Sequence, residues 1–156
     1  MNLCAVLLSW VFNLSDYERV EGCPTMQTVP HEWLEEQACS GRKCRVLGWY
    51  PGRGDVVYLD ERMDIQNNLL HTSIALHEIA HWVQGKAGSL LQDCETSLLA
   101  EREAYHIQAK FLQAYGTYQP VGSVLPMIHC EATHVAEVAH PDQPNPPTPT
   151  VAATAQ

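Results

Sequence analysis

Apolar residues recur every three or four positions over residues 69–85, which predicts an amphipathic helix in this stretch. Asn67, Asn68 and Thr72 are candidate N-caps, and Gly85 is a natural residue at the C-terminal end. The positions that make up the apolar surface are Leu70, Ile74, Ala75, Ile79, Trp82 and Val83. His77 and His81 have apolar neighbours, so we expect the helix to be buried.

A second long helix is predicted over residues 94–115. Asp93 or Thr96 can cap its beginning, and Gly116 ends it. Its apolar positions are Leu98, Ala104, Ile107, Phe111 and Leu112. The two helices are the longest elements that the sequence predicts.

Shorter elements surround this helix pair. Pro30 fits the first turn of a helix over residues 31–38. Residues 44–50 and 55–60 are typical of β-strands, and the Pro-Gly-Arg-Gly sequence between them predicts a β-hairpin. Residues 125–138 are compatible with a last helix, with a proline near its beginning. Together these elements predict a small α+β fold, with a small sheet or hairpin packed on two long helices.

The chain has 156 residues, 46% hydrophobic and 17% charged, as expected for one globular domain. We expect that domain to span residues 23–139, after an N-terminal segment (1–22) and before a Pro-rich disordered tail (140–156). The apolar residues 1–14 are too short to span a bilayer, and they are either a degenerate secretory signal or a structural segment. A net charge of −9 argues against nucleic acid or an anionic membrane as the main partner.

Six cysteines favour an oxidising compartment, so we expect a periplasmic or secreted protein, with a cytoplasmic protein carrying reduced thiols as the alternative. Cys39 and Cys44 flank a turn-like stretch and are expected to form a disulfide. The sequence does not determine how the other cysteines pair.

The first long helix carries the motif H-E-x-x-H, formed by His77, Glu78 and His81. Residues four apart lie on one face of a helix, so the two imidazoles can bind one metal ion. Glu78 lies about 100° further around the helix, from where it can reach a water molecule near the metal. Imidazole ligands with an open coordination position suit zinc, Zn²⁺. The alternative is that both histidines are core residues bonded to backbone carbonyls.

A catalytic zinc ion usually has three protein ligands, and an acidic residue on the second helix can supply the third. With H-E-x-x-H on one helix and E-R-E-A-Y at residues 101–105 on the next, the chain resembles the gluzincin metallopeptidases, in particular small uncharacterised bacterial proteins. The resemblance covers about residues 46–112. It implies His77, His81 and Glu101 as zinc ligands and Glu78 as the general base.

Two residues of the second helix, Glu103 and Tyr105, have more than one possible role. Glu103 is the alternative third ligand, but it is two residues from Glu101 and therefore about 200° around the helix, on the more polar side. Tyr105 stands where many gluzincins have an acidic residue that orients a zinc histidine. Its phenol can accept a hydrogen bond from an imidazole, donate one to a developing oxyanion, or simply pack.

These features predict a small zincin that hydrolyses peptide or protein amide bonds, with an open cleft rather than a deep pocket. Zinc would lower the pKa of its water to about 7, and Glu78 would transfer a proton from that water to the leaving amine. An exposed strand edge beside the metal could pair with an extended peptide, or the strand could only cover the helix. The alternative functions are a non-catalytic zinc-stabilised binding module and a protease that cuts one regulatory protein, such as a repressor.

Overall fold

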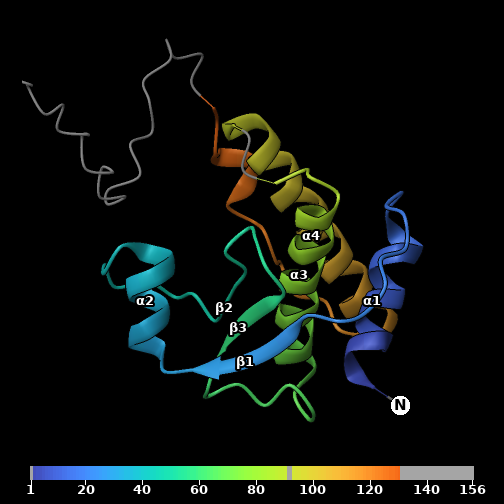
Figure 1. Ribbon diagram of the computed structural model, residues 1–156, viewed down its shortest axis with the longest axis horizontal. Coiled ribbons are helices and arrows are strands. Elements are labelled where there is room, and N and C mark those ends of the chain that lie inside the picture. The colour runs from blue at the N-terminus through green and yellow to red at the C-terminus, as the bar shows by residue number, and fades with distance from the viewer. Residues whose placement is uncertain (1, 91–92, 131–156) are drawn as a thin grey trace, which may run out of the picture.

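The computed structural model describes residues 2–90 and 93–130 (Figure 1). These residues form a small α+β fold, as predicted. In chain order the elements are α1 (Leu3–Leu14), β1 (Thr25–Val29), α2 (His31–Cys39), β2 (Gly48–Trp49), β3 (Val56–Asp60), α3 (Leu69–Lys86), α4 (Cys94–Ala114) and a short 3-10 helix, η1 (Leu125–Met127).

Helix α3 lies at the centre of the molecule (Figure 1). The sheet and α2 lie on one side of it, α4 runs alongside it, and α1 packs against both long helices. Every residue from 75 to 84 is buried, which is the expected result for a helix whose residues are mostly apolar on all sides. Asn68 caps α3 by accepting hydrogen bonds from the amides of Leu70 and His71. The predicted helix at residues 69–85 is therefore confirmed.

The sheet has the strand order β1-β3-β2. The central strand β3 alternates, with Val57 and Leu59 buried against the helices. Strand β2 pairs antiparallel with β3, so the hairpin is confirmed, but β2 is only two residues long rather than seven. Strand β1 pairs parallel with β3 and was not predicted. Only Val29 of its five residues is buried, so its sequence lacks the alternation of apolar and polar residues by which a strand is recognised.

The remaining helix predictions had mixed outcomes. Helix α4 is confirmed, and Asp93 and Thr96 together form a capping box at its beginning. Helix α2 is confirmed within one residue. The helix expected over residues 125–138 is wrong in its first part, because the 3-10 turn η1 ends at Met127 and residues 128–130 are not helical. The rest of that helix and the predicted tail at 140–156 lie outside the described residues.

The N-terminal segment forms helix α1, which contributes Cys4, Leu7, Leu8 and Val11 to the core. A disulfide between Cys4 and Cys23 joins α1 to the residues before β1. The segment thus has the packing expected of a structural element. No helix within the described residues is long and apolar enough to span a membrane.

All six cysteines are paired in the structure. The predicted Cys39–Cys44 disulfide is confirmed and closes the loop after α2. The third disulfide, Cys94–Cys130, joins the first residue of α4 to the segment after η1. The core is therefore covalently reinforced at its N-terminal helix and at α4.

A buried carboxylate attaches α2 to the sheet. Asp60, at the end of β3, is fully buried and accepts hydrogen bonds from Arg62. His31, the first residue of α2, also contacts it, with Nδ1 2.8 Å from Oδ2. The Arg62 hydrogen bonds outweigh the effect of burial and lower the pKa of Asp60 from 3.8 to about 2. Asp60 is therefore ionised, with partners on both sides.

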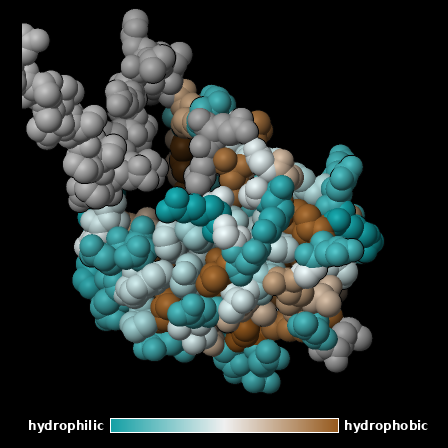
Figure 2. Space-filling view, in the orientation of Figure 1, coloured by the Kyte–Doolittle hydropathy of each residue, from teal (hydrophilic) through white to brown (hydrophobic). Residues whose placement is uncertain are grey.

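Hydrophobic residues on the face in Figure 2 are scattered among hydrophilic ones, without one continuous apolar patch. Exposed apolar side chains of the described residues include several in the segment that follows α4, namely Tyr118, Val124, Met127 and Ile128. Single exposed apolar residues of this kind are common on protein surfaces.

Candidate metal centre

The two motif histidines converge on one point. His77 and His81 are one helical turn apart on α3, and their Nε2 atoms are 3.0 Å apart. The two rings are nearly perpendicular, at 83°, with centroids 4.6 Å apart. Both residues are at least nine-tenths buried. This arrangement argues against two independent core histidines that each bond to a backbone carbonyl.

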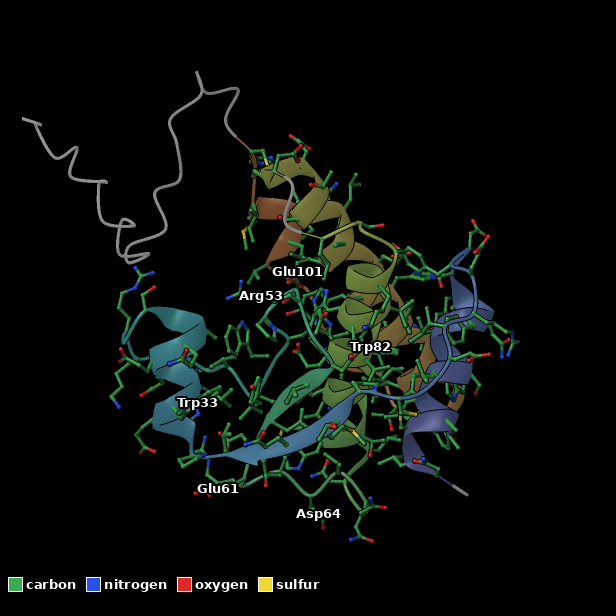
Figure 3. All side chains as sticks on the ribbon, in the orientation of Figure 1. Trp33, Arg53, Glu61, Asp64, Trp82 and Glu101 are labelled. Atoms are coloured by element: carbon green, nitrogen blue, oxygen red, sulfur yellow. A yellow bond between two sulfur atoms is a disulfide. The ribbon has the colours of Figure 1, made fainter. Side chains whose placement is uncertain are left out.

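Glu101 completes the group from α4. Its Oε2 lies 3.3 Å from His77 Nε2, and its Oε1 lies 3.3 Å from His81 Nε2. Figure 3 shows Glu101 beside the upper turns of α3, near the turn that carries Arg53. The structure therefore brings together the three residues that the resemblance implies as ligands.

The spacing of the donor groups is compatible with one metal ion. Zn–N and Zn–O bonds of about 2.0–2.1 Å in a tetrahedron place the ligand atoms about 3.3–3.4 Å apart. The two Nε2 atoms are 3.0 Å apart, and each lies 3.3 Å from a different oxygen of the Glu101 carboxylate. Two imidazoles and one carboxylate, with the remaining direction open, are a donor set that suits zinc.

The charges in the group support one another. Burial raises the pKa of the Glu101 carboxyl, but hydrogen bonds and charges from His77 and His81 outweigh it and lower the pKa well below the usual range. Burial lowers the pKa of His81, but Glu101 and Glu78 outweigh it and raise the pKa to about 8. In the absence of a metal the carboxylate is thus ionised, and positive charge is favoured beside it.

Glu78 lies outside this group, against strand β2. Its side chain contacts Gly48, where an added Cβ would lie 2.6 Å from Glu78 Cγ. The charges of His77 and His81 and the nearby backbone amide of Tyr50 favour the ionised form of its carboxylate. Only 8% of Glu78 is exposed to solvent, and this burial disfavours the charged form and raises the pKa of its carboxyl. A carboxylate with a raised pKa beside a metal site is suited to accept and release a proton.

Tyr105 packs between the metal site and the segment after α4. Its ring centroid lies 4.3 Å from that of His77, and the other side of the ring is in close contact with Gly122. Burial, together with the charges of Glu101 and Glu78, raises the pKa of its phenol, which therefore stays protonated at neutral pH. The packing interpretation is supported, and a role as hydrogen-bond donor to substrate stays a prediction.

Glu103 does not join the group of three. Its Oε2 instead accepts a hydrogen bond from Nε2 of Gln84, at 2.9 Å. The expectation that Glu103 lies on a solvated face is wrong, because the side chain is half-buried against the end of α3. Sequence analysis missed Gln84 altogether, although its position three residues after His81 places it on the same face of the helix.

The three candidate ligands and Glu78 line an open cleft with a volume of about 330 Å³. Its opposite wall comes from β2 and the turn that follows it, including Trp49 and Gly52. Strand β2 is an edge of the sheet, so one side of its backbone pairs with β3, while no strand within residues 2–90 and 93–130 covers the other side. A cleft beside a strand edge suits an extended chain better than a compact small molecule.

Comparison of the chain with protein-family models, with curated proteins and with solved structures found no match. The chemistry assigned to the site therefore rests on its own side-chain geometry.

Proposed function

We propose that this protein is a zinc-dependent metallopeptidase that hydrolyses peptide or protein amide bonds, as the resemblance to gluzincins implies. The observation that carries the proposal is the position of Glu78. Its carboxylate is buried and lines the same cleft as the three residues that could hold a metal ion. A site that only stabilises a fold does not need this second carboxylate beside an open coordination position.

Each residue of the proposed site then has a defined role. His77, His81 and Glu101 hold the ion, which when bound supplies Lewis acidity to a water molecule and to the scissile carbonyl. Glu78 accepts the proton of the attacking water and delivers it to the leaving amine. The phenol of Tyr105, which packs against His77 and lines the same cleft, would donate a hydrogen bond to the oxyanion that develops on the substrate.

The substrate class follows from the cleft. An extended peptide can add to the free side of β2, which gives main-chain hydrogen bonds and places a peptide bond near Glu78. Several of the described residues that line the cleft lie in and around β2, so side-chain specificity is expected to come from this part of the chain.

A substitution of the general base tests the proposal. The purified protein should contain about one zinc ion per chain and should cut a denatured protein or a peptide library, and chelation should abolish the cutting. Glu78→Gln should keep the zinc and lose the hydrolysis, because the amide cannot accept the proton.

Two results would contradict the proposal. If the zinc-loaded parent cuts no member of a broad peptide library, the alternative of a non-catalytic zinc module takes its place. If Glu78→Gln cuts as fast as the parent, Glu78 is not the base.

A further inference from the structure

A buried glutamine lies directly behind the second histidine. Gln84 is fully buried, and its Oε1 is 2.7 Å from Nδ1 of His81. Its Nε2 is 3.0 Å from the carbonyl oxygen of Ala100 and 2.9 Å from Oε2 of Glu103. The glutamine therefore connects α3 to α4 on the side of His81 that faces away from Glu101.

The partners of Gln84 fix the orientation of its amide. The Ala100 carbonyl and the Glu103 carboxylate can only accept hydrogen bonds, so the NH₂ group of Gln84 must face them. Its carbonyl oxygen must then face His81 Nδ1, which in turn must carry a proton. With the proton on Nδ1, the lone pair of the neutral imidazole is on Nε2, the atom that faces His77 and Glu101.

We infer that Gln84, held by Glu103, is a positioning residue that fixes the ring orientation and metal-binding tautomer of His81. This inference rests on the proposed metal site. The Ala100 carbonyl and the Glu103 carboxylate hold the amide of Gln84, which in turn presents its oxygen to the imidazole of His81.

The other histidine provides an internal contrast. Nδ1 of His77 is buried and has no hydrogen-bond partner among the described residues. Its ring is held instead by packing against Tyr105, at a centroid distance of 4.3 Å. Only His81 of the two histidines is thus oriented by a hydrogen bond to Nδ1. Loss of Gln84 should therefore affect the ring of His81 more than the ring of His77.

The network extends to the N-terminal segment. The hydroxyl of Tyr17 lies close to Glu103, Gln84 and Ser89, and burial together with Glu103 raises its pKa. The Gln84–Glu103 pair therefore also faces the N-terminal segment.

Substitution of Gln84 by Leu replaces the amide that accepts from His81 with an apolar side chain of similar size. Loss of an outer-shell hydrogen bond of this kind typically weakens metal binding about 10–100-fold. We expect that loss of zinc affinity for Gln84→Leu, measured by competition with a chelator. Glu103→Leu should give a smaller loss, because the Ala100 carbonyl still accepts from Gln84.

Gln108 offers a matched control. It is a second buried glutamine between α3 and α4, and its Nε2 donates to Ser73 Oγ at 3.0 Å rather than acting on a histidine. Gln108→Leu should lower the stability to a similar extent and leave zinc affinity unchanged. The comparison separates a positioning role from a loss of stability.

A second readout does not need the metal. In metal-free protein at about pH 9.5, above the raised pKa of about 8 of His81, the ring is neutral and its ¹⁵N NMR shifts report the tautomer. The parent should show the proton of His81 on Nδ1, and Gln84→Leu should shift it toward Nε2. If Gln84→Leu does not fold, Glu103→Leu acts on the same amide from a half-buried position.

The outcomes are distinct. Zinc affinity and tautomer that are both unchanged in Gln84→Leu would overturn the inference, as would an equal loss of affinity in Gln108→Leu. If the parent binds no zinc, the proposed metal site fails, while the tautomer measurement still decides whether Gln84 orients His81.

Discussion

The contact between Gly48 and Glu78 predicts that one methyl group can separate catalysis from metal binding. A Cβ added at Gly48 would lie 2.6 Å from Cγ of Glu78, 2.9 Å from its Oε1 and 3.1 Å from its Cδ. Carbon atoms in normal contact are about 3.5–4.0 Å apart, so Glu78 must move by about 1 Å. The φ angle of Gly48 is not positive, so alanine introduces crowding without backbone strain.

A displacement of about 1 Å of a catalytic group can reduce the rate about 100-fold. We therefore expect Gly48→Ala to lower kcat by about that factor on a denatured protein substrate. Zinc affinity should be unchanged, because the three ligand atoms lie on α3 and α4 and no ligand atom is among the atoms closest to the new Cβ. Overpacking should also lower the free energy of unfolding by about 1–3 kcal/mol.

Gly85→Ala is the matched control for crowding. Its Cβ would lie 2.8 Å from Oη and 2.9 Å from Cε1 of Tyr50, so it crowds the same interface between α3 and the β2 segment without contacting Glu78. We expect it to retain hydrolysis. A double-mutant cycle in urea unfolding supplies a readout that is independent of activity: the stability cost of Gly48→Ala should shrink in a Glu78→Ala background. An undiminished cost there, or a parent-like kcat in Gly48→Ala, would refute the reasoning.

Three further outcomes are expected. Glu101→Ala should remove most of the bound zinc in an elemental assay, because it deletes one of three ligands; full occupancy would exclude Glu101 as a ligand. Ionised Asp60 stabilises the fold above pH 3.8, the pKa of its unfolded state, and this stabilisation is lost as the pH falls toward about 2. Acid should therefore lower the free energy of unfolding of the parent by about 1–2 kcal/mol more than that of Asp60→Asn, after allowance for solvent screening. Leu7→Ala, at a fully buried position of α1, should lower the free energy of unfolding by about 2–5 kcal/mol in urea; a negligible loss would show that α1 is dispensable for the core.

Local sequence determined the elements that carry the site. Each of these signals acts over about four residues and can be recognised without the fold: the apolar period of α3 and α4, the caps Asn68 and Asp93, and the H-E-x-x-H spacing. The same helical geometry predicted that Glu101 and Glu103 face different ways. The structure agrees with that separation, since Glu101 faces the histidines and Glu103 faces Gln84.

Contacts between distant segments were decided by the tertiary structure alone. Strand β1 has no apolar alternation and is defined by its pairing with β3, about 30 residues away in the chain. The pairing of Cys4 with Cys23 and of Cys94 with Cys130 depends on how α1 and the segment after η1 return to the core.

The same holds for the surroundings of the candidate metal centre. Gly48 matters because β2 passes directly over Glu78, and Gln84 matters because α4 presents acceptors to its amide. A short pattern cannot encode either relation, since each depends on the distance between two elements after packing. The sequence thus determined which side chains can meet a metal ion, while the packing of α3 against α4 and β2 determined how those side chains are held.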